Sequence, residues 1–118
     1  MKLKEIREIL DAEPLVVIDE KLEVKKVCGS DLLSDVLAFS QKKSMLLTGL
    51  TNPQVIRTAD MIELQVIVFV RGKSPQSATV NMARENGISL YITGKSMFES
   101  CGLLYQHGLQ PEQLEEIG

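Results

Sequence analysis

The chain has 118 residues, a mean hydropathy of +0.04 and a formal net charge of −3, which fits one folded domain and excludes a disordered chain. No apolar run reaches the ~18 residues of a membrane span, and the amino-terminal residues lack a signal-peptide core. We therefore expect a cytoplasmic protein that does not bind membranes. Because there is no basic excess to neutralise phosphates, we also expect that it does not bind nucleic acid.

The first third of the chain predicts two helices and two short strands. Leucine and isoleucine recur at helical spacing over residues 3–10, and Pro14 ends this amphipathic helix. A β-branched run at residues 15–18 predicts a strand. Residues 22–28 alternate imperfectly and carry lysines, which is typical of an edge strand. A serine cap, an acidic first turn and an apolar stripe then predict a helix over residues 30–37.

After a polar loop at residues 41–43, the chain repeats a unit made of a strand, a glycine turn and a helix. The first strand, residues 44–48, is apolar up to its final threonine and is followed by Gly49. Asn52 then predicts a helix start, because its side chain can accept a backbone N–H hydrogen bond and Pro53 pre-sets the helical φ.

This unit recurs twice. Residues 66–70, VIVFV, predict a central strand, and an arginine–glycine turn leads to Ser74 as cap and Pro75 as the first residue of a helix. Residues 88–92 predict the next strand, and a threonine–glycine turn leads to Ser96, which forms a capping box with the glutamate three residues later. The apolar face of this last helix is expected to contain Met97, Phe98, Cys101, Leu104 and Tyr105.

Alternating strands and helices predict an α/β fold with a mainly parallel sheet of about five strands and helices on both faces. All three turns should then lie on one edge, at the carboxyl ends of the strands, where open parallel sheets bind ligands. Helix starts present backbone N–H groups there and nearby cations add charge, which favours a small anion. The predicted contacts are Gly49, Thr51, Asn52, Arg71, Gly72, Lys73, Thr93, Gly94, Lys95 and Ser96. Plain structural turns without a ligand are the open alternative.

The sequence contains no catalytic or metal-binding motif that we recognise. The tripeptides at residues 72–74 and 94–96, both Gly-Lys-Ser, resemble the end of a P-loop, but each lacks the glycine five residues earlier. His107 is not matched to a nucleophile, and the two cysteines lack metal-ligand spacing. Cys101 is expected to pack as a small apolar group, whereas Cys28, next to lysines, keeps the alternative of a reactive thiol. We expect no cofactor and no enzymatic activity.

The segments LLTGLTNPQVIRTA, VIVFVRGKSP and ISLYITGKSMFESCGLLY, with the amphipathic first helix, resemble the DRTGG domain over residues 3–105. More distantly, the same pattern is similar to the N-terminal domain of HPr kinase/phosphorylase. The namesake five-residue string is missing here, so the resemblance transfers no functional residue. It implies a stand-alone accessory domain at residues 1–108, which an acidic tail at residues 109–118 follows.

We therefore expect a regulatory or ligand-sensing accessory domain that binds a nucleotide or a phosphorylated metabolite at the edge formed by the three turns. The resemblance also implies self-association, so a homodimer is the expected state. Two alternatives stay open: a protein-interaction module that docks on a larger metabolic enzyme or kinase, and an enzyme of a type that we do not recognise.

Overall fold

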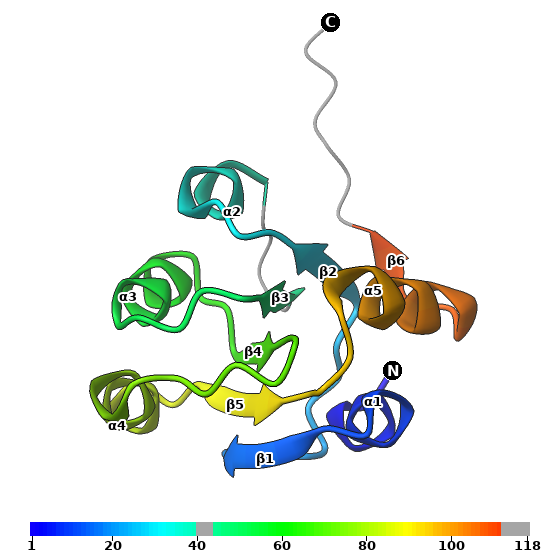
Figure 1. The fold of residues 1–118 in the computed structure, drawn as a ribbon, viewed down its shortest axis with the longest axis horizontal. Coiled ribbons are helices and arrows are strands. Elements are labelled where there is room, and N and C mark those ends of the chain that lie inside the picture. Colours follow the sequence, from blue (N-terminus) through cyan, green and yellow to red (C-terminus); the bar gives the residue numbers. More distant parts are fainter. Residues whose placement is uncertain (40–43, 112–118) are drawn as a thin grey trace, which may run out of the picture.

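A six-stranded sheet forms the centre of the part of the chain that the computed structural model describes, residues 1–39 and 44–111 (Figure 1). In chain order the elements are α1 (Leu3–Leu10), β1 (Glu13–Val16), β2 (Lys26–Gly29), α2 (Leu33–Phe39), β3 (Ser44–Thr48), α3 (Gln54–Met61), β4 (Val66–Phe69), α4 (Ser77–Glu85), β5 (Ser89–Ile92), α5 (Met97–Gln106) and β6 (Gln110–Pro111). The predicted loop at residues 41–43 and the last seven residues of the predicted tail lie outside the described part.

The strand order is β1-β5-β4-β3-β2-β6, and every pair of neighbouring strands in this described sheet is parallel except β1 and β5. The strands from β2 to β5 follow one another both in sequence and in space, since one helix connects each strand to the next. This arrangement confirms the predicted α/β fold with a mainly parallel sheet.

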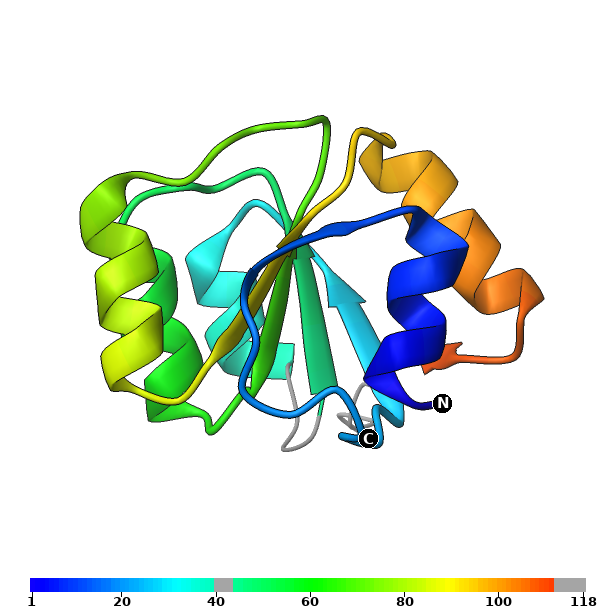
Figure 2. The same cartoon turned by 90° about the horizontal axis from the view of Figure 1, so that it is seen from below.

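Helices cover both faces of the sheet, with α1 and α5 on one side and α2, α3 and α4 on the other (Figure 2). Alternate residues of each strand therefore enter different cores. Met45 and Leu47 of β3 pack in the cluster with α1 and α5, whereas Leu46 packs in the cluster with α3. All four residues of β4 are buried, as expected for a central strand.

Two strands differ from their predicted bounds. β1 begins at Glu13 and ends at Val16, while Val17 and Ile18 are about half exposed. Pro14 lies inside this strand because β1 is at the edge of the sheet, where one side needs no N–H donor. β2 is shorter than residues 22–28, and it is not an edge strand because β6 pairs along its outer side. β6 has two residues, one of them Pro111, and is too short to give a sequence pattern.

The predicted start of α4 is two residues too early, because the chain stays extended as far as Gln76. The carbonyl oxygen of Thr51 fixes this start. It accepts hydrogen bonds from the amide of Gln76 at 3.3 Å and from the hydroxyl of Thr79 at 2.7 Å. Ser74 and Pro75 therefore lie in the loop before the helix instead of forming its cap and first residue.

The predicted apolar face of α5 is also partly wrong. Phe98 is 90% exposed and Tyr105 is 69% exposed, so neither aromatic side chain is buried against the sheet. Met97, Cys101 and Leu104 pack toward the sheet, as predicted. These five apolar residues span about two and a half helical turns. They form a stripe wider than the sheet can cover, and sequence spacing alone does not show which side of the stripe is exposed.

The predicted helix ends and starts are mostly confirmed. The hydroxyl of Ser96 accepts a hydrogen bond from the amide of Glu99 at 3.1 Å, and Asn52 accepts one from the amide of Gln54 at the same distance. Gly87, with φ of +69°, ends the turn after α4. His107 contacts the carbonyl oxygen of Leu103 at 2.7 Å, as expected for a side chain at a helix carboxyl end.

Candidate functional site

The three predicted glycine turns lie side by side on one edge of the sheet. Thr48 at the end of β3 is in register with Phe69 at the end of β4, which is in register with Ile92 at the end of β5. The residues that follow these three positions therefore belong to neighbouring turns. Convergence of the turns was the central sequence prediction for the site, and the topology confirms it.

The side chain of Asp31, which the sequence did not single out as a site residue, contacts the first of these turns. One carboxylate oxygen, Oδ1, accepts hydrogen bonds from the amide of Gly49 at 2.6 Å and from the hydroxyl of Thr48 at 3.2 Å. The other oxygen, Oδ2, lies 3.5 Å from a guanidinium nitrogen of Arg71. Asp31 comes from the loop between β2 and α2, so it joins three neighbouring loops.

Arg71 itself has a left-handed backbone conformation, with φ of +61°. Its amide donates to the carbonyl oxygen of Lys95 at 2.8 Å, and the amide of Gly72 donates to the carbonyl oxygen of Thr93 at 2.8 Å. The second and third turns are thus joined by backbone hydrogen bonds. Two of the amide groups that we expected to face a ligand are bonded to protein acceptors.

The third turn borders a polar hollow. Its Thr93 is buried, donates to the carbonyl oxygen of Leu10 at 2.7 Å and accepts from the amide of Lys95 at 3.3 Å. The amide of the exposed Gly94 has no acceptor among the described residues. The hollow has a volume of about 290 Å³ and is lined by Leu10, Asp11, Thr93, Gly94, Lys95 and Glu99.

The remaining predicted site residues mainly shape the turns. Thr51 accepts hydrogen bonds from the start of α4, Asn52 accepts one from the first amide of α3, and Ser96 caps α5. The side chain of Lys73 is exposed, that of Lys95 is half-buried, and neither forms an ion pair with another described residue. Their positive charges remain available to a ligand.

The edge is electrostatically balanced, although its cations had suggested a positive rim. Arg71 and the two lysines face three carboxylates, those of Asp31, Asp11 and Glu99. Asp31 and Arg71 are each about half exposed, so water screens their ion pair. No group of three or more histidine, cysteine or acidic side chains suited to a metal ion is found within residues 1–39 and 44–111.

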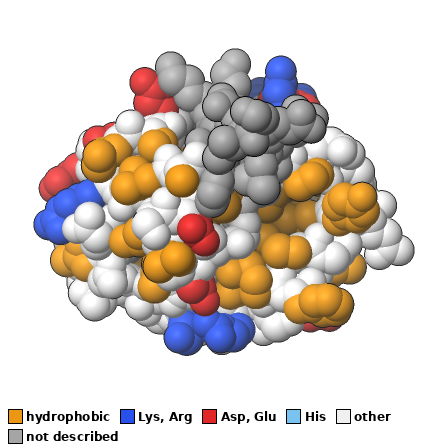
Figure 3. Space-filling model, turned by 90° about the horizontal axis from the view of Figure 1, so that it is seen from above, with side chains coloured by type: hydrophobic (Ala, Val, Ile, Leu, Met, Phe, Trp, Pro, Cys, Tyr) orange, Lys and Arg blue, Asp and Glu red, His pale blue; other side chains and the backbone are white. Residues whose placement is uncertain are grey.

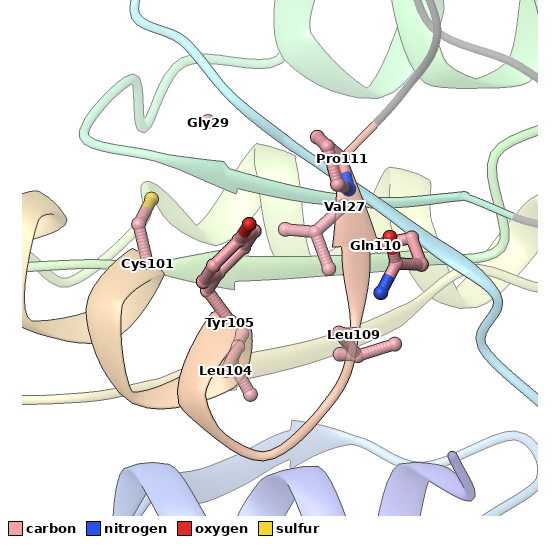
Figure 4. Close-up of a pocket in the computed structure, with 8 residues that line it drawn as sticks. All are labelled: Val27, Gly29, Cys101, Leu104, Tyr105, Leu109, Gln110 and Pro111. Atoms are coloured by element: carbon pink, nitrogen blue, oxygen red, sulfur yellow. The ribbon is translucent and has the colours of Figure 1, made fainter.

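A second, apolar hollow lies on the side of the sheet that α5 covers (Figure 4). It has a volume of about 150 Å³ and is lined by Val27, Gly29, Cys101, Leu104, Tyr105, Leu109, Gln110 and Pro111. Figure 4 shows Cys101 and Tyr105 projecting from α5 on the side of β2. Figure 3 views the molecule from above Figure 1, on the side where α2 and β6 lie. It shows hydrophobic side chains gathered around a recess on the α5 side.

Glycine at position 29 makes this close packing possible. A Cβ atom there would lie 3.0 Å from the sulfur of Cys101 and 3.1 Å from that of Met97. Burial raises the pKa of the Cys101 thiol, which keeps it protonated and apolar. Cys28 is half-buried on the opposite face of the sheet, in the core with Leu46, so each cysteine packs against a different core.

Comparison with known proteins identifies the fold. No family model and no curated protein sequence matches the chain. A solved structure of the CBS and DRTGG domains of the regulatory region of Clostridium perfringens pyrophosphatase, in complex with its activator diadenosine tetraphosphate, matches with a TM-score of 0.75 at 17% sequence identity. The match covers 89% of this chain and 46% of that chain, so this chain spans about half of the matched structure.

The described helices include none long and apolar enough to cross a membrane.

Proposed function

We propose, on the premise of a DRTGG-like fold, that the chain is a regulatory, ligand-sensing domain without catalytic activity, which binds a small anion at the edge formed by the three turns. The ligand class is a nucleotide or a phosphorylated metabolite. The matched pyrophosphatase region binds a nucleotide activator, and this supports the class of function without specifying the ligand.

The observation that carries the proposal is the set of donors around Asp31. The hydroxyl of Thr48 and the amide of Gly49 in the first turn, and the guanidinium of Arg71 in the second, converge on one carboxylate that comes from a third loop. Phosphate oxygens accept hydrogen bonds from the same three kinds of donor, and arginine matches them especially well. A set of donors for an oxyanion is therefore already formed, and at present it binds an anion of the protein itself.

Two further features support Arg71 as a ligand contact. A left-handed conformation costs a residue other than glycine roughly 1–2 kcal/mol, and such strain is concentrated at functional sites. Lys73 lies in the second turn, with Arg71, and Lys95 lies in the third turn. Their positive charges would attract a ligand that carries more than one phosphate. The exposed amide of Gly94 offers one more donor toward the polar hollow.

The test is a thermal-shift and calorimetric titration with inorganic phosphate, pyrophosphate and ATP. A ligand at 100 times its Kd stabilises the folded state by about 2.7 kcal/mol, so binding should raise the melting temperature. Arg71→Gln should lose this rise, whereas Arg84→Gln, an exposed arginine in the last turn of α4, should keep it. If the wild-type chain shows neither heat nor a shift with any of these anions, the proposed function is wrong.

A second candidate is a protein-interaction module, and the surface of α5 favours it. Phe98 and Tyr105 are seven residues apart on one helix, both are largely exposed, and Tyr105 lines the apolar hollow. Exposed aromatic side chains beside a pocket are typical of protein interfaces. This surface would join two copies in a homodimer or dock on a larger metabolic enzyme or kinase.

Sedimentation equilibrium tests the dimer. Phe98→Ser together with Tyr105→Ser should shift a dimer to the monomer, whereas Met61→Ser removes an equally exposed side chain from α3 and should not. A wild-type chain that is monomeric at high concentration would refute the homodimer and leave docking on a larger enzyme or kinase. If the α5 double variant still bound such a partner, docking through this surface would also be refuted.

A further inference from the structure

Asp31 is positioned by the backbone on both sides of it. The amide of Ser30 donates to the carbonyl oxygen of Leu47 in β3 at 3.0 Å, and the hydroxyl of Ser30 accepts from the amide of Leu32 at 3.1 Å. The carbonyl oxygen of Leu32 in turn accepts from the amides of Asp35 and Val36 in the first turn of α2. The carboxylate is thus held over the first turn by a short loop and not by a long flexible side chain.

A ligand anion and this carboxylate need the same donors. Oδ1 already takes the amide of Gly49 and the hydroxyl of Thr48, and Oδ2 faces Arg71. Each N–H or O–H donates well to one acceptor at a time, and two anions at this distance repel each other. The anionic group of a ligand can therefore reach the three donors only when Asp31 leaves them.

We infer that Asp31 is an internal competitor, which occupies the anion position in the ligand-free domain and is displaced when an anionic ligand binds. This inference rests on the proposed function of the same site. Displacement also changes the charge of the edge, because without the carboxylate of Asp31 the three cations face only two carboxylates, those of Asp11 and Glu99.

The displacement of Asp31 needs a movement of only a short loop. Leu32 is 57% exposed, whereas Val36, one turn into α2, is fully buried in the core. The loop at residues 30–32 can therefore turn outward while Val36 holds the body of α2 in place. Ligand binding would change the surface in front of α2, around Leu32, and a partner could sense that change without any movement of the sheet.

The test compares Asp31→Asn with Asp35→Asn in calorimetric titrations with pyrophosphate. Both variants remove one negative charge from the same region, and Asp35 is exposed in the first turn of α2, where its side chain forms no hydrogen bond or ion pair with another described residue. Loss of a charged competitor should strengthen pyrophosphate binding by Asp31→Asn by about tenfold or more. Asp35→Asn should bind within about twofold of the wild-type chain, since a distant exposed charge is screened.

The outcomes separate the two ideas. Equal binding by both variants, or weaker binding by Asp31→Asn, overturns the competitor role and leaves the proposed function standing. Failure of the wild-type chain and both variants to bind any phosphate probe overturns both. Pyrophosphate binding by the wild-type chain, with tighter binding by Asp31→Asn and unchanged binding by Asp35→Asn, supports both.

A measurement on the wild-type chain does not depend on the folding of any variant. During a pyrophosphate titration, the side-chain carboxyl carbon resonance of Asp31 should move with the same midpoint as the amide resonance of Gly49, while that of Asp35 stays in place. A shift at Gly49 with no change at Asp31 would overturn the inference, because the ligand would then bind beside the carboxylate.

Discussion

Gly49→Ala is expected to separate binding from stability. A Cβ atom at this position would overlap a guanidinium nitrogen of Arg71 and would lie 3.4 Å from Oδ1 of Asp31, which is an ordinary contact. Gly49 is not in the left-handed region, so alanine brings no backbone strain. The atom that must move is the end of a flexible, half-exposed side chain, and Arg71 should swing toward water.

The size of each effect follows from these contacts. Loss of an exposed ion pair costs about 0–1 kcal/mol, and alanine recovers up to about 1 kcal/mol by restricting the unfolded chain. The melting temperature should therefore change by no more than about 5 °C. Loss of a charged hydrogen bond to the ligand, about 1.5–3 kcal/mol, should weaken pyrophosphate binding roughly 10- to 100-fold.

Circular-dichroism melts and calorimetric titrations on the same preparations measure both quantities. Gly102→Ala in α5 is the matched control, because an added Cβ there would have no atom within 4 Å and should leave binding unchanged. Wild-type affinity in Gly49→Ala would refute the role of Arg71. Global unfolding of Gly49→Ala would show that the arginine cannot move away, and would refute the account of the turn.

Three other predictions follow from single contacts. Arg71→Gly should keep the stability within about 1 kcal/mol, because relief of the left-handed strain offsets the lost ion pair, while pyrophosphate binding disappears from calorimetric titrations. Thr93→Val should leave the buried carbonyl of Leu10 unpaired at a cost of about 1–3 kcal/mol, and each kcal/mol should lower the melting temperature by about 4–5 °C; an unchanged melt would contradict this. Tyr91→Phe should not destabilise the domain at neutral pH, since the buried hydroxyl of Tyr91 has no partner among the described residues. Burial, and to a lesser extent Glu20, raises the pKa of Tyr91, so the stability of the wild-type chain should be complete below its ordinary pKa of about 10 and should fall as the pH rises above it. Urea unfolding of the Phe variant over the same pH range should lack that part of the loss.

The sequence was sufficient for the central part of the fold because each unit of strand, turn and helix carries its own local signals. Apolar runs, glycine turns and caps at Asn52 and Ser96 all depend on neighbouring residues and are readable from one chain. The ends of the sheet depend instead on distant pairing. β6 exists because Gln110 and Pro111 lie beside β2, more than eighty residues earlier, and two residues contain no periodicity.

The site shows the same limit. Convergence of the glycine turns follows from strand order and was predictable, and their detailed contacts were not. Asp31 belongs to the loop after β2, which parallel pairing places beside the turn after β3, yet the sequence assigns it only to a helix start. Parallel pairing of the two strands was the available signal, and it would have placed Asp31 near Gly49. Phe98 was misplaced because a wide apolar stripe does not show which side meets water.

Both outermost strands of the sheet contain a proline, Pro14 in β1 and Pro111 in β6. Proline cannot donate a backbone hydrogen bond, so neither border is a good template for the growth of intermolecular β-structure. The molecule should therefore resist fibril formation even at high concentration in the cell. Any assembly that it does form should proceed through packing of side chains on its helices, and replacement of both prolines by threonine should open the borders to ordered aggregation.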